Sequence, residues 1–301
     1  MAPAPFLSAR FWSGGRKSSP RLDRPSFNPS SVACAIMYNT LEERAAIHAV
    51  PGNQVVPGIV VGVGSPVPPS VEPERERQTV GLSRPFLVYI GRIDPNKSCA
   101  EMFDYFQRYV DRSDRLLDLI LIGTQAFPTP DDPGIRHLWF ASDRDKFDVL
   151  SAAEPLIMPS YFERLSMVIL EAWALGRPVL ANGRCHVLAG RCQRSDAGLG
   201  CKNAGEFAVA LDRLLHNPSY SSAFGSNRRE YFTRHDSWPV IERTYVDKFG
   251  QLRSEPAPRR MERPFGWFGR RKPTVPAATM VTAGLPSGPV PPPEILSGVP
   301  A

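Results

Sequence analysis

Two basic side chains follow an apolar run about a third of the way along the sequence. Arg92 and Lys97 lie five residues apart in a loop that begins at Gly91, and residues 86–90 before this loop form a continuous apolar run. Paired cations of this kind can neutralise the charge of a phosphate or diphosphate group. Taken alone, such a pair is more often two solvated loop cations, so its interpretation depends on what lies beside it.

Two acidic side chains follow a later apolar run. Glu163 and Glu171 lie eight residues apart, the first in an expected loop and the second within an expected helix. Leu165, Ser166 and Met167 are expected in the first turn of that helix, where backbone amides lack intrahelical partners and can bind an anion. An ionised carboxylate can accept hydrogen bonds from two vicinal hydroxyl groups. Together with the cations, the pattern suits a ligand that carries a diphosphate and vicinal hydroxyl groups.

Repeated strand and helix patterns must position these residues. Between about residues 83 and 250, short apolar runs alternate with helical periodicity, which predicts an α/β fold with a Rossmann-like parallel sheet covered by helices. The predicted strands are 86–90, 116–123, 137–140, 155–159 and one that begins at 178–181. The predicted helices follow Ser98, span 145–153 and 166–175, follow Asn203, and span 237–249. In such a sheet, ligands bind outside the carboxyl ends of the strands.

Polar residues mark the starts of several predicted helices. Ser98 stands three residues before Glu101, which predicts a capping box. Asn203 stands in the same relation to Glu206. The run Asp143-Arg144-Asp145 matches an Asp-x-Asp metal motif, but acidic residues at the start of a helix are better explained by the helix dipole.

Charge and cysteine content exclude several classes of protein. The formal net charge is +6, but residues 1–33 and 251–301 each carry +4, so the basicity belongs to the ends and predicts no nucleic-acid groove. The basic, aromatic-rich stretch 263–272 is compatible with contact to a membrane surface or a partner, although disorder is the simpler interpretation.

His186 could approach the predicted site, but a surface-loop histidine is the simpler interpretation. Reduced thiols in a cytoplasmic protein are predicted for the five cysteines, which lack metal-ligand spacing: Cys34, Cys99, Cys185, Cys192 and Cys201.

Two patterns carry a resemblance to a known family. The first is Gly-Arg-x4-Lys at 91–97, and the second is Pro-Ser-x2-Glu-x7-Glu-Ala-x3-Gly-x-Pro-Val at 159–179. Together they resemble the C-terminal, nucleotide-sugar-binding domain of the retaining glycosyltransferases of the GT-B fold, group 1 (family 4). The resemblance covers about residues 83–250 and implies that this region is one half of a GT-B fold.

The resemblance implies roles for individual residues. Arg92 and Lys97 would neutralise the diphosphate of the donor and of the leaving nucleoside diphosphate. Glu171 would hold the ribose hydroxyls, and Glu163 would contact the transferred sugar. Gly91 and the backbone amides of Leu165, Ser166 and Met167 would complete the donor site. The catalytic residues would be Arg92, Lys97 and Glu163, with no metal and no cofactor besides the nucleoside diphosphate sugar.

The ends of the chain depart from the family pattern. Of the 32 prolines, eleven lie in residues 1–80 and eleven in residues 251–301, so little packed structure is expected there. The N-terminal partner domain of a GT-B enzyme, which binds the acceptor, is expected to be largely missing. The predicted division is a disordered basic tail at 1–33, a remnant of the acceptor domain with a linker at 34–82, the nucleotide-sugar-binding domain at 83–250, and a disordered proline-rich tail at 251–301.

Two functional hypotheses follow from this pattern. The first is a retaining glycosyltransferase with an unknown acceptor, either truncated or completed by an N-terminal half or acceptor domain on another chain. The second is a catalytically inactive module that binds nucleotide sugars or mediates an interaction.

Overall fold

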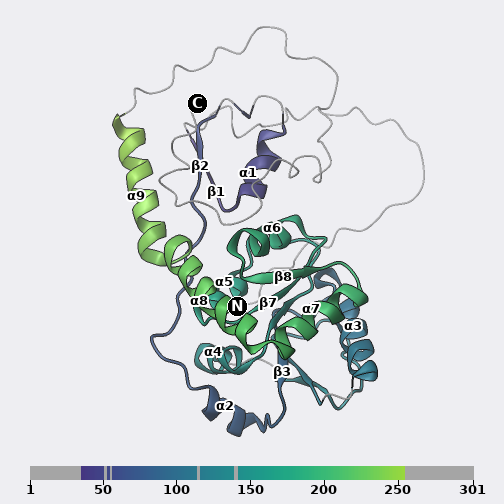
Figure 1. Ribbon diagram of the computed structural model, residues 1–301. Coiled ribbons are helices and arrows are strands. Elements are labelled where there is room, and N and C mark those ends of the chain that lie inside the picture. Colours follow the sequence, from purple (N-terminus) through teal and green to yellow (C-terminus); the bar gives the residue numbers. More distant parts are fainter. Residues whose placement is uncertain (1–34, 51–52, 55, 114–115, 139–141, 255–301) are drawn as a thin grey trace, which may run out of the picture.

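A parallel sheet of six strands forms the centre of the structure (Figure 1). The computed structural model describes residues 35–50, 53–54, 56–113, 116–138 and 142–254. The sheet has the order β5-β4-β3-β6-β7-β8. Its strands are β3 (Phe86–Ile90), β4 (Asp118–Ile122), β5 (Ile135–His137), β6 (Leu156–Met158), β7 (Val179–Asn182) and β8 (Gly198–Cys201). The predicted parallel sheet covered by helices is therefore confirmed.

The five predicted strands are all present, with shifts at their ends. The first strand has the predicted bounds, and all five of its residues are buried, as expected for a strand covered on both faces. The third strand begins two residues earlier than predicted, at Ile135, and Trp139 and Phe140 lie outside the described residues. Strand β8, which the sequence did not indicate, has two glycines among its four residues and little apolar periodicity.

Helices cover both faces of the sheet, so the core consists of two clusters, one on each face. On one face, α3 (Cys99–Arg112) and α7 (Ala204–His216) pack over Leu87, Tyr89 and their neighbours. On the other face, α4 (Asp143–Ala152), α5 (Met167–Ala174) and α6 (His186–Ser195) pack over Phe86 and Val88. Helices α8 (Pro218–His235) and α9 (Trp238–Ser254) follow, and α8 packs against α5.

A small N-terminal unit is attached to this domain. Strands β1 (Ile36–Tyr38) and β2 (Gly58–Val60) pair in parallel, helix α1 (Leu41–His48) connects them, and helix α2 (Pro73–Val80) leads into the main sheet. The predicted remnant at 34–82 thus contains a strand, a helix and a second strand, followed by helix α2. Helix α1 packs against α6, where Glu42 and Arg194 form a buried ion pair of 2.5 Å. The predicted tail at 1–33 lies outside the described residues, as does most of the tail at 251–301, whose first four residues belong to α9.

The predicted capping box at Ser98 is wrong, whereas the one at Asn203 is confirmed in its main bond. Ser98 precedes α3 with φ 58° and ψ 32°, and its side chain makes no capping hydrogen bond. A short 3₁₀ turn, Pro95–Lys97, enters α3 directly and leaves Ser98 in the left-handed conformation. Asn203 accepts a hydrogen bond from the Glu206 amide at 2.9 Å.

Within the described ranges, no helix is both long and apolar enough to cross a bilayer.

The loops after β3 and β4 touch through their backbones. The Gly91 amide donates to the Ile122 carbonyl at 2.9 Å. Gly123 has φ 135°, and a Cβ atom added there would lie 2.2 Å from the Gly91 carbonyl oxygen. The loop that carries Arg92 and Lys97 is therefore fixed against its neighbour by a contact that only glycine permits.

Gly123→Ala is expected to destabilise the protein by about 2 kcal/mol or more, because the added methyl group displaces the Gly91 carbonyl and the backbone is strained. Urea unfolding followed by circular dichroism measures the change. Gly250→Ala in α9 is the control, because nothing lies within 4 Å of the added Cβ. Equal stabilities of Gly123→Ala and the wild type would contradict this account of the loop.

Candidate functional site

The predicted site residues lie at the carboxyl ends of β3 and β6, the two central strands. From β3, successive strands are added toward β5 on one side, and from β6 toward β8 on the other. The loops after β3 and β6 therefore leave the sheet in opposite directions. In open α/β sheets the crevice at such a reversal is the usual place for a ligand.

Lys97 and Glu163 meet across this reversal. The Lys97 Nζ atom lies 2.5 Å from Glu163 Oε1, and the side chains are 33% and 14% exposed. Lys97 ends the 3₁₀ turn after β3, and Glu163 stands in the loop between β6 and α5. The structure thus brings a residue predicted to bind phosphate into contact with a residue predicted to bind the sugar, although the two are 66 positions apart in the sequence.

Arg92 belongs to the same loop as Lys97 but has a different partner. Its Nε atom lies 2.9 Å from Asp94 Oδ2, and its side chain is 57% exposed. The Arg92 carbonyl accepts a hydrogen bond of 2.8 Å from the Tyr89 hydroxyl, which fixes the backbone of the loop. Because an exposed ion pair of this kind is weak, the guanidinium group can exchange Asp94 for an anion at little cost.

Helix α5 begins later than predicted. Its first residue is Met167, so Leu165 and Ser166 lie before the helix and the predicted turn of 165–167 is wrong in this respect. Ser166 has φ 67° and ψ 98°, and its side chain makes no capping bond. The helix start therefore leaves its first amides without a side-chain cap, as an anion site requires.

Glu171 lies in the second turn of α5 and is buried, with 7% of its surface exposed. Its Oε1 atom accepts a hydrogen bond of 3.0 Å from Lys146 of α4. Burial raises the pKa of the Glu171 carboxyl, and the charge and hydrogen bond of Lys146 oppose this effect. Among the hydrogen bonds and ion pairs of the described residues, none links Glu171 to Lys97 or Arg92.

The acidic start of α4 serves the helix, as predicted. The Ser142 side chain accepts from the Asp145 amide, and Asp143 and Asp145 occupy the first turn. His186 is not a loop residue as expected but the first residue of α6, which the sequence analysis did not predict.

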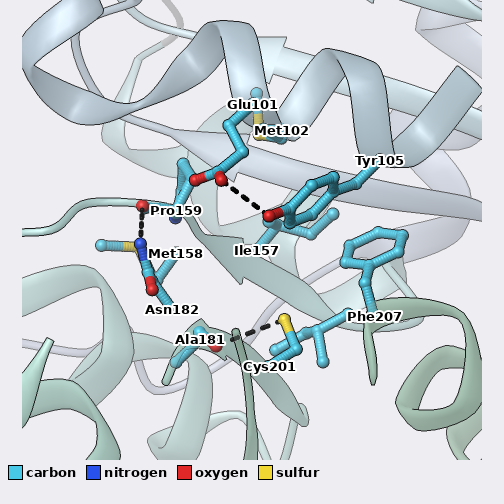
Figure 2. A pocket seen from close by; sticks show the side chains of 11 residues that line it. Glu101, Met102, Tyr105, Ile157, Met158, Pro159, Ala181, Asn182, Cys201 and Phe207 are labelled. Atoms are coloured by element: carbon cyan, nitrogen blue, oxygen red, sulfur yellow. Dashed lines mark hydrogen bonds between the residues drawn. The ribbon is translucent and has the colours of Figure 1, made fainter. Parts of the chain in front are cut away.

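A group of polar side chains that the sequence did not indicate borders a cavity of about 20 Å³ beneath the β6 and β7 ends (Figure 2). Glu101 accepts hydrogen bonds from Tyr105 at 2.6 Å and Tyr161 at 3.3 Å, and it pairs with Arg184. The Arg184 guanidinium lies 4.7 Å from the centre of the Tyr161 ring. Burial acts to raise the pKa of Glu101, but these hydrogen bonds lower it overall.

The predicted donor-site residues do not line this cavity. Its lining includes Glu101, Tyr105 and Asn182 but neither Glu163 nor Glu171, and it has room for about one water molecule. Tyr161 stands two residues before Glu163, so the group around Glu101 holds the loop that carries Glu163. Spacing in the sequence could not connect Glu101 with Arg184, because the two residues come from different βα units.

Comparison with known proteins identifies the domain. Residues 84–217 match the family described as glycosyl transferases group 1. The chain is similar to D-inositol 3-phosphate glycosyltransferase 2 of Catenulispora acidiphila, with 29% identity over 198 residues that cover 58% of this chain and 45% of that protein. It is also similar to trehalose synthase of Rubrobacter xylanophilus, with 26% identity over 195 residues and the same two shares. The chain thus spans about half the length of these curated relatives.

The fold is shared with solved glycosyltransferase structures. The Anabaena protein HepE in complex with UDP-glucose superposes with a TM-score of 0.60 and 15% identity, over 73% of this chain and 64% of that one. At this identity the likeness concerns the fold alone. Residues 84–217 therefore match a group 1 glycosyltransferase domain, and the parallel sheet has the fold of the GT-B glycosyltransferases.

Proposed function

We propose that this domain binds a nucleoside diphosphate sugar and that the chain takes part in retaining sugar transfer to an acceptor. The observation that carries the proposal is the meeting of Lys97 and Glu163 at the reversal between β3 and β6. A cation and a carboxylate at one sheet edge suit a ligand that presents a diphosphate next to a polyhydroxyl sugar. The UDP-glucose bound to the structurally similar HepE supports this class of donor.

In this proposal, the diphosphate lies between Lys97, Arg92 and the first amides of α5. Glu163 then exchanges its bond to Lys97 for hydroxyl groups of the transferred sugar, and Glu171 accepts the ribose hydroxyls. The two cations and the start of α5 stabilise the charge that develops on the departing diphosphate. Catalysis without a divalent metal stays a prediction.

The proposed transfer needs no nucleophile from the protein. The bond between the anomeric carbon and the diphosphate oxygen breaks while the acceptor oxygen bonds to the same face of that carbon. The acceptor proton passes to the departing phosphate oxygen. The residues that bind the acceptor are expected from an N-terminal half or a separate acceptor domain. Without such a partner, the domain described here would act as a binding module.

Glu171→Ala is expected to weaken UDP binding by about 1.5–3 kcal/mol, the range for hydrogen bonds to a charged group. Isothermal titration calorimetry with UDP and GDP measures the effect in the wild type and the variant. Glu242→Ala, at an exposed position of α9, serves as the control and should bind as the wild type does. If neither nucleotide gives heat with the wild type, the binding proposal fails, and equal affinity of wild type and Glu171→Ala would remove Glu171 from the site.

Glu163→Gln is expected to bind UDP at least as tightly as the wild type, because the change releases Lys97 and removes a negative charge beside the diphosphate. The same variant should bind UDP-glucose no better than UDP, since Glu163 is proposed to contact the sugar. Lys97→Ala should weaken both ligands by about tenfold or more, which corresponds to one charged hydrogen bond. Competition titrations measure the ratios, and a Glu163→Gln variant that loses UDP and UDP-glucose affinity equally would contradict the assigned role.

A further inference from the structure

Lys146 is the one cation in contact with Glu171 among the described residues. Its Nζ atom lies 3.0 Å from Glu171 Oε1 and 3.2 Å from Asp143 Oδ1. The Lys146 side chain is 18% exposed and that of Glu171 is 9% exposed, whereas that of Asp143 is 91% exposed. The pair with Glu171 is therefore shielded from water, and the pair with Asp143 is weak and solvent-screened.

The two oxygens of the Glu171 carboxylate differ. Oε1 accepts from Lys146, whereas Oε2 is buried and has no hydrogen-bond partner among the described residues. A buried carboxylate oxygen without a partner costs free energy, and a ligand hydroxyl group that donates to it removes that cost. Oε2 is therefore the oxygen that still lacks a donor, and Oε1 is the one through which Lys146 holds the carboxylate.

The remaining charges near Glu171 do not replace Lys146. Asp143 acts in the opposite direction, because its negative charge raises the pKa of the Glu171 carboxyl. On α8, Arg228 and Arg229 bind the carbonyls of Gly176 and Leu175, at the far end of α5. Burial alone would favour the neutral carboxyl, so the ionised form depends on Lys146.

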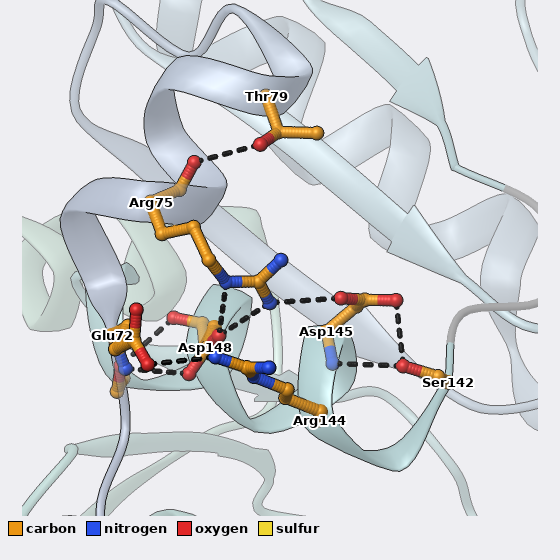
Figure 3. Close-up of polar contacts among 8 residues, drawn as sticks. Glu72, Arg75, Thr79, Ser142, Arg144, Asp145 and Asp148 are labelled. Atoms are coloured by element: carbon orange, nitrogen blue, oxygen red, sulfur yellow. Dashed lines mark hydrogen bonds and ion pairs between the residues drawn. The ribbon is translucent and has the colours of Figure 1, made fainter.

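Helix α4, which carries Lys146, is fixed by polar contacts with α2 (Figure 3). Arg75 of α2 donates to Asp148 at 2.6 and 3.1 Å and to Asp145 at 2.8 Å. The Glu72 amide donates to the other oxygen of Asp148 at 2.6 Å. Asp148 is 2% exposed, so this contact is a buried anchor between the two helices. Lys146 is thereby held by a helix that is braced at its first two turns.

We propose that Lys146 is a positioning residue of the donor site, which keeps the Glu171 carboxylate charged and leaves its Oε2 atom to accept the pentose hydroxyls. The inference rests on the proposed donor function and adds a residue that the sequence patterns did not indicate. Lys146 acts through Glu171 and makes no contact with the nucleotide in this arrangement. Its effect should therefore depend on pH and on the presence of the hydroxyl groups.

Lys146→Met should weaken UDP binding by about tenfold at about pH 7, because a Glu171 carboxyl that is largely protonated no longer offers a charged acceptor to the hydroxyl groups. Without the cation, the Glu171 carboxyl takes up a proton at higher pH than in the wild type. UDP affinity of the variant should therefore rise toward the wild-type value as the pH approaches about 9, while wild-type affinity changes little over this range. Calorimetric titrations at several pH values measure the two profiles.

Two comparisons separate this role from other roles of Lys146. Lys146→Met should bind 2′,3′-dideoxyuridine diphosphate as well as the wild type does, because that ligand lacks the hydroxyl groups. Lys146→Arg should keep the wild-type pH profile. Arg144→Met removes an exposed cation from the same helix, which pairs with Glu72 instead, and should have no effect. Equal losses for UDP and the dideoxy ligand would assign Lys146 to the diphosphate and overturn the proposal.

A titration without nucleotide tests the inference independently of the proposed function. The carboxyl carbon of Glu171, labelled with ¹³C and assigned with Glu171→Gln, reports the pKa by nuclear magnetic resonance. Lys146→Met should raise this pKa by about one unit or more, and Lys146→Arg should not. The same pKa in Lys146→Met and the wild type would overturn the inference. A wild type that binds no UDP but shows the expected pKa difference would instead refute the donor function.

Discussion

A buried carboxylate next to an open sheet edge is the constraint on which the site depends. Glu171 lies in an apolar helix whose neighbours Leu170, Ala172 and Trp173 are fully buried, and burial opposes its negative charge. A second element must therefore bring a cation to it, and α4 does so with Lys146. The ion pair between Arg75 and Asp148 fixes helix α2 on α4. The ion pair between Lys146 and Glu171 adds little net stability, and we infer that it serves to keep the carboxylate charged.

The same edge shows how parallel strands gather distant residues. The carboxyl ends of β3 and β6 are adjacent in the sheet, so the loops that follow them place Lys97 beside Glu163. The backbone contact between Gly91 and Gly123 fixes the first loop, and the group around Glu101 and Tyr161 fixes the second. The backbones that carry these charged side chains are thus held in place.

Apolar runs predicted the strands well, because a strand covered on both faces needs a continuous run of apolar residues. Phe86–Ile90 meets that condition fully, whereas the two glycines of β8 do not, and this strand was missed. The capping box at Ser98 failed because the 3₁₀ turn before α3 places the serine at positive φ, a feature of the whole loop that a four-residue pattern does not contain.

The candidate site was predictable for the residues that the two motifs contain and not for residues outside them. Arg92, Lys97, Glu163 and Glu171 followed from spacing, although their roles toward a ligand stay predictions. Lys146 stands outside either pattern, and only the packing of α4 on α5 brings it to Glu171. Arg184 likewise pairs with Glu101 only because the sheet brings their two βα units together.

A crystal structure of the protein with UDP tests the account most directly. The account predicts the diphosphate against Lys97 and the first amides of α5, with the ribose hydroxyls on Glu171 Oε2 and Lys146 still on Oε1. A nucleotide bound elsewhere, or one whose ribose leaves Glu171 untouched, would contradict it.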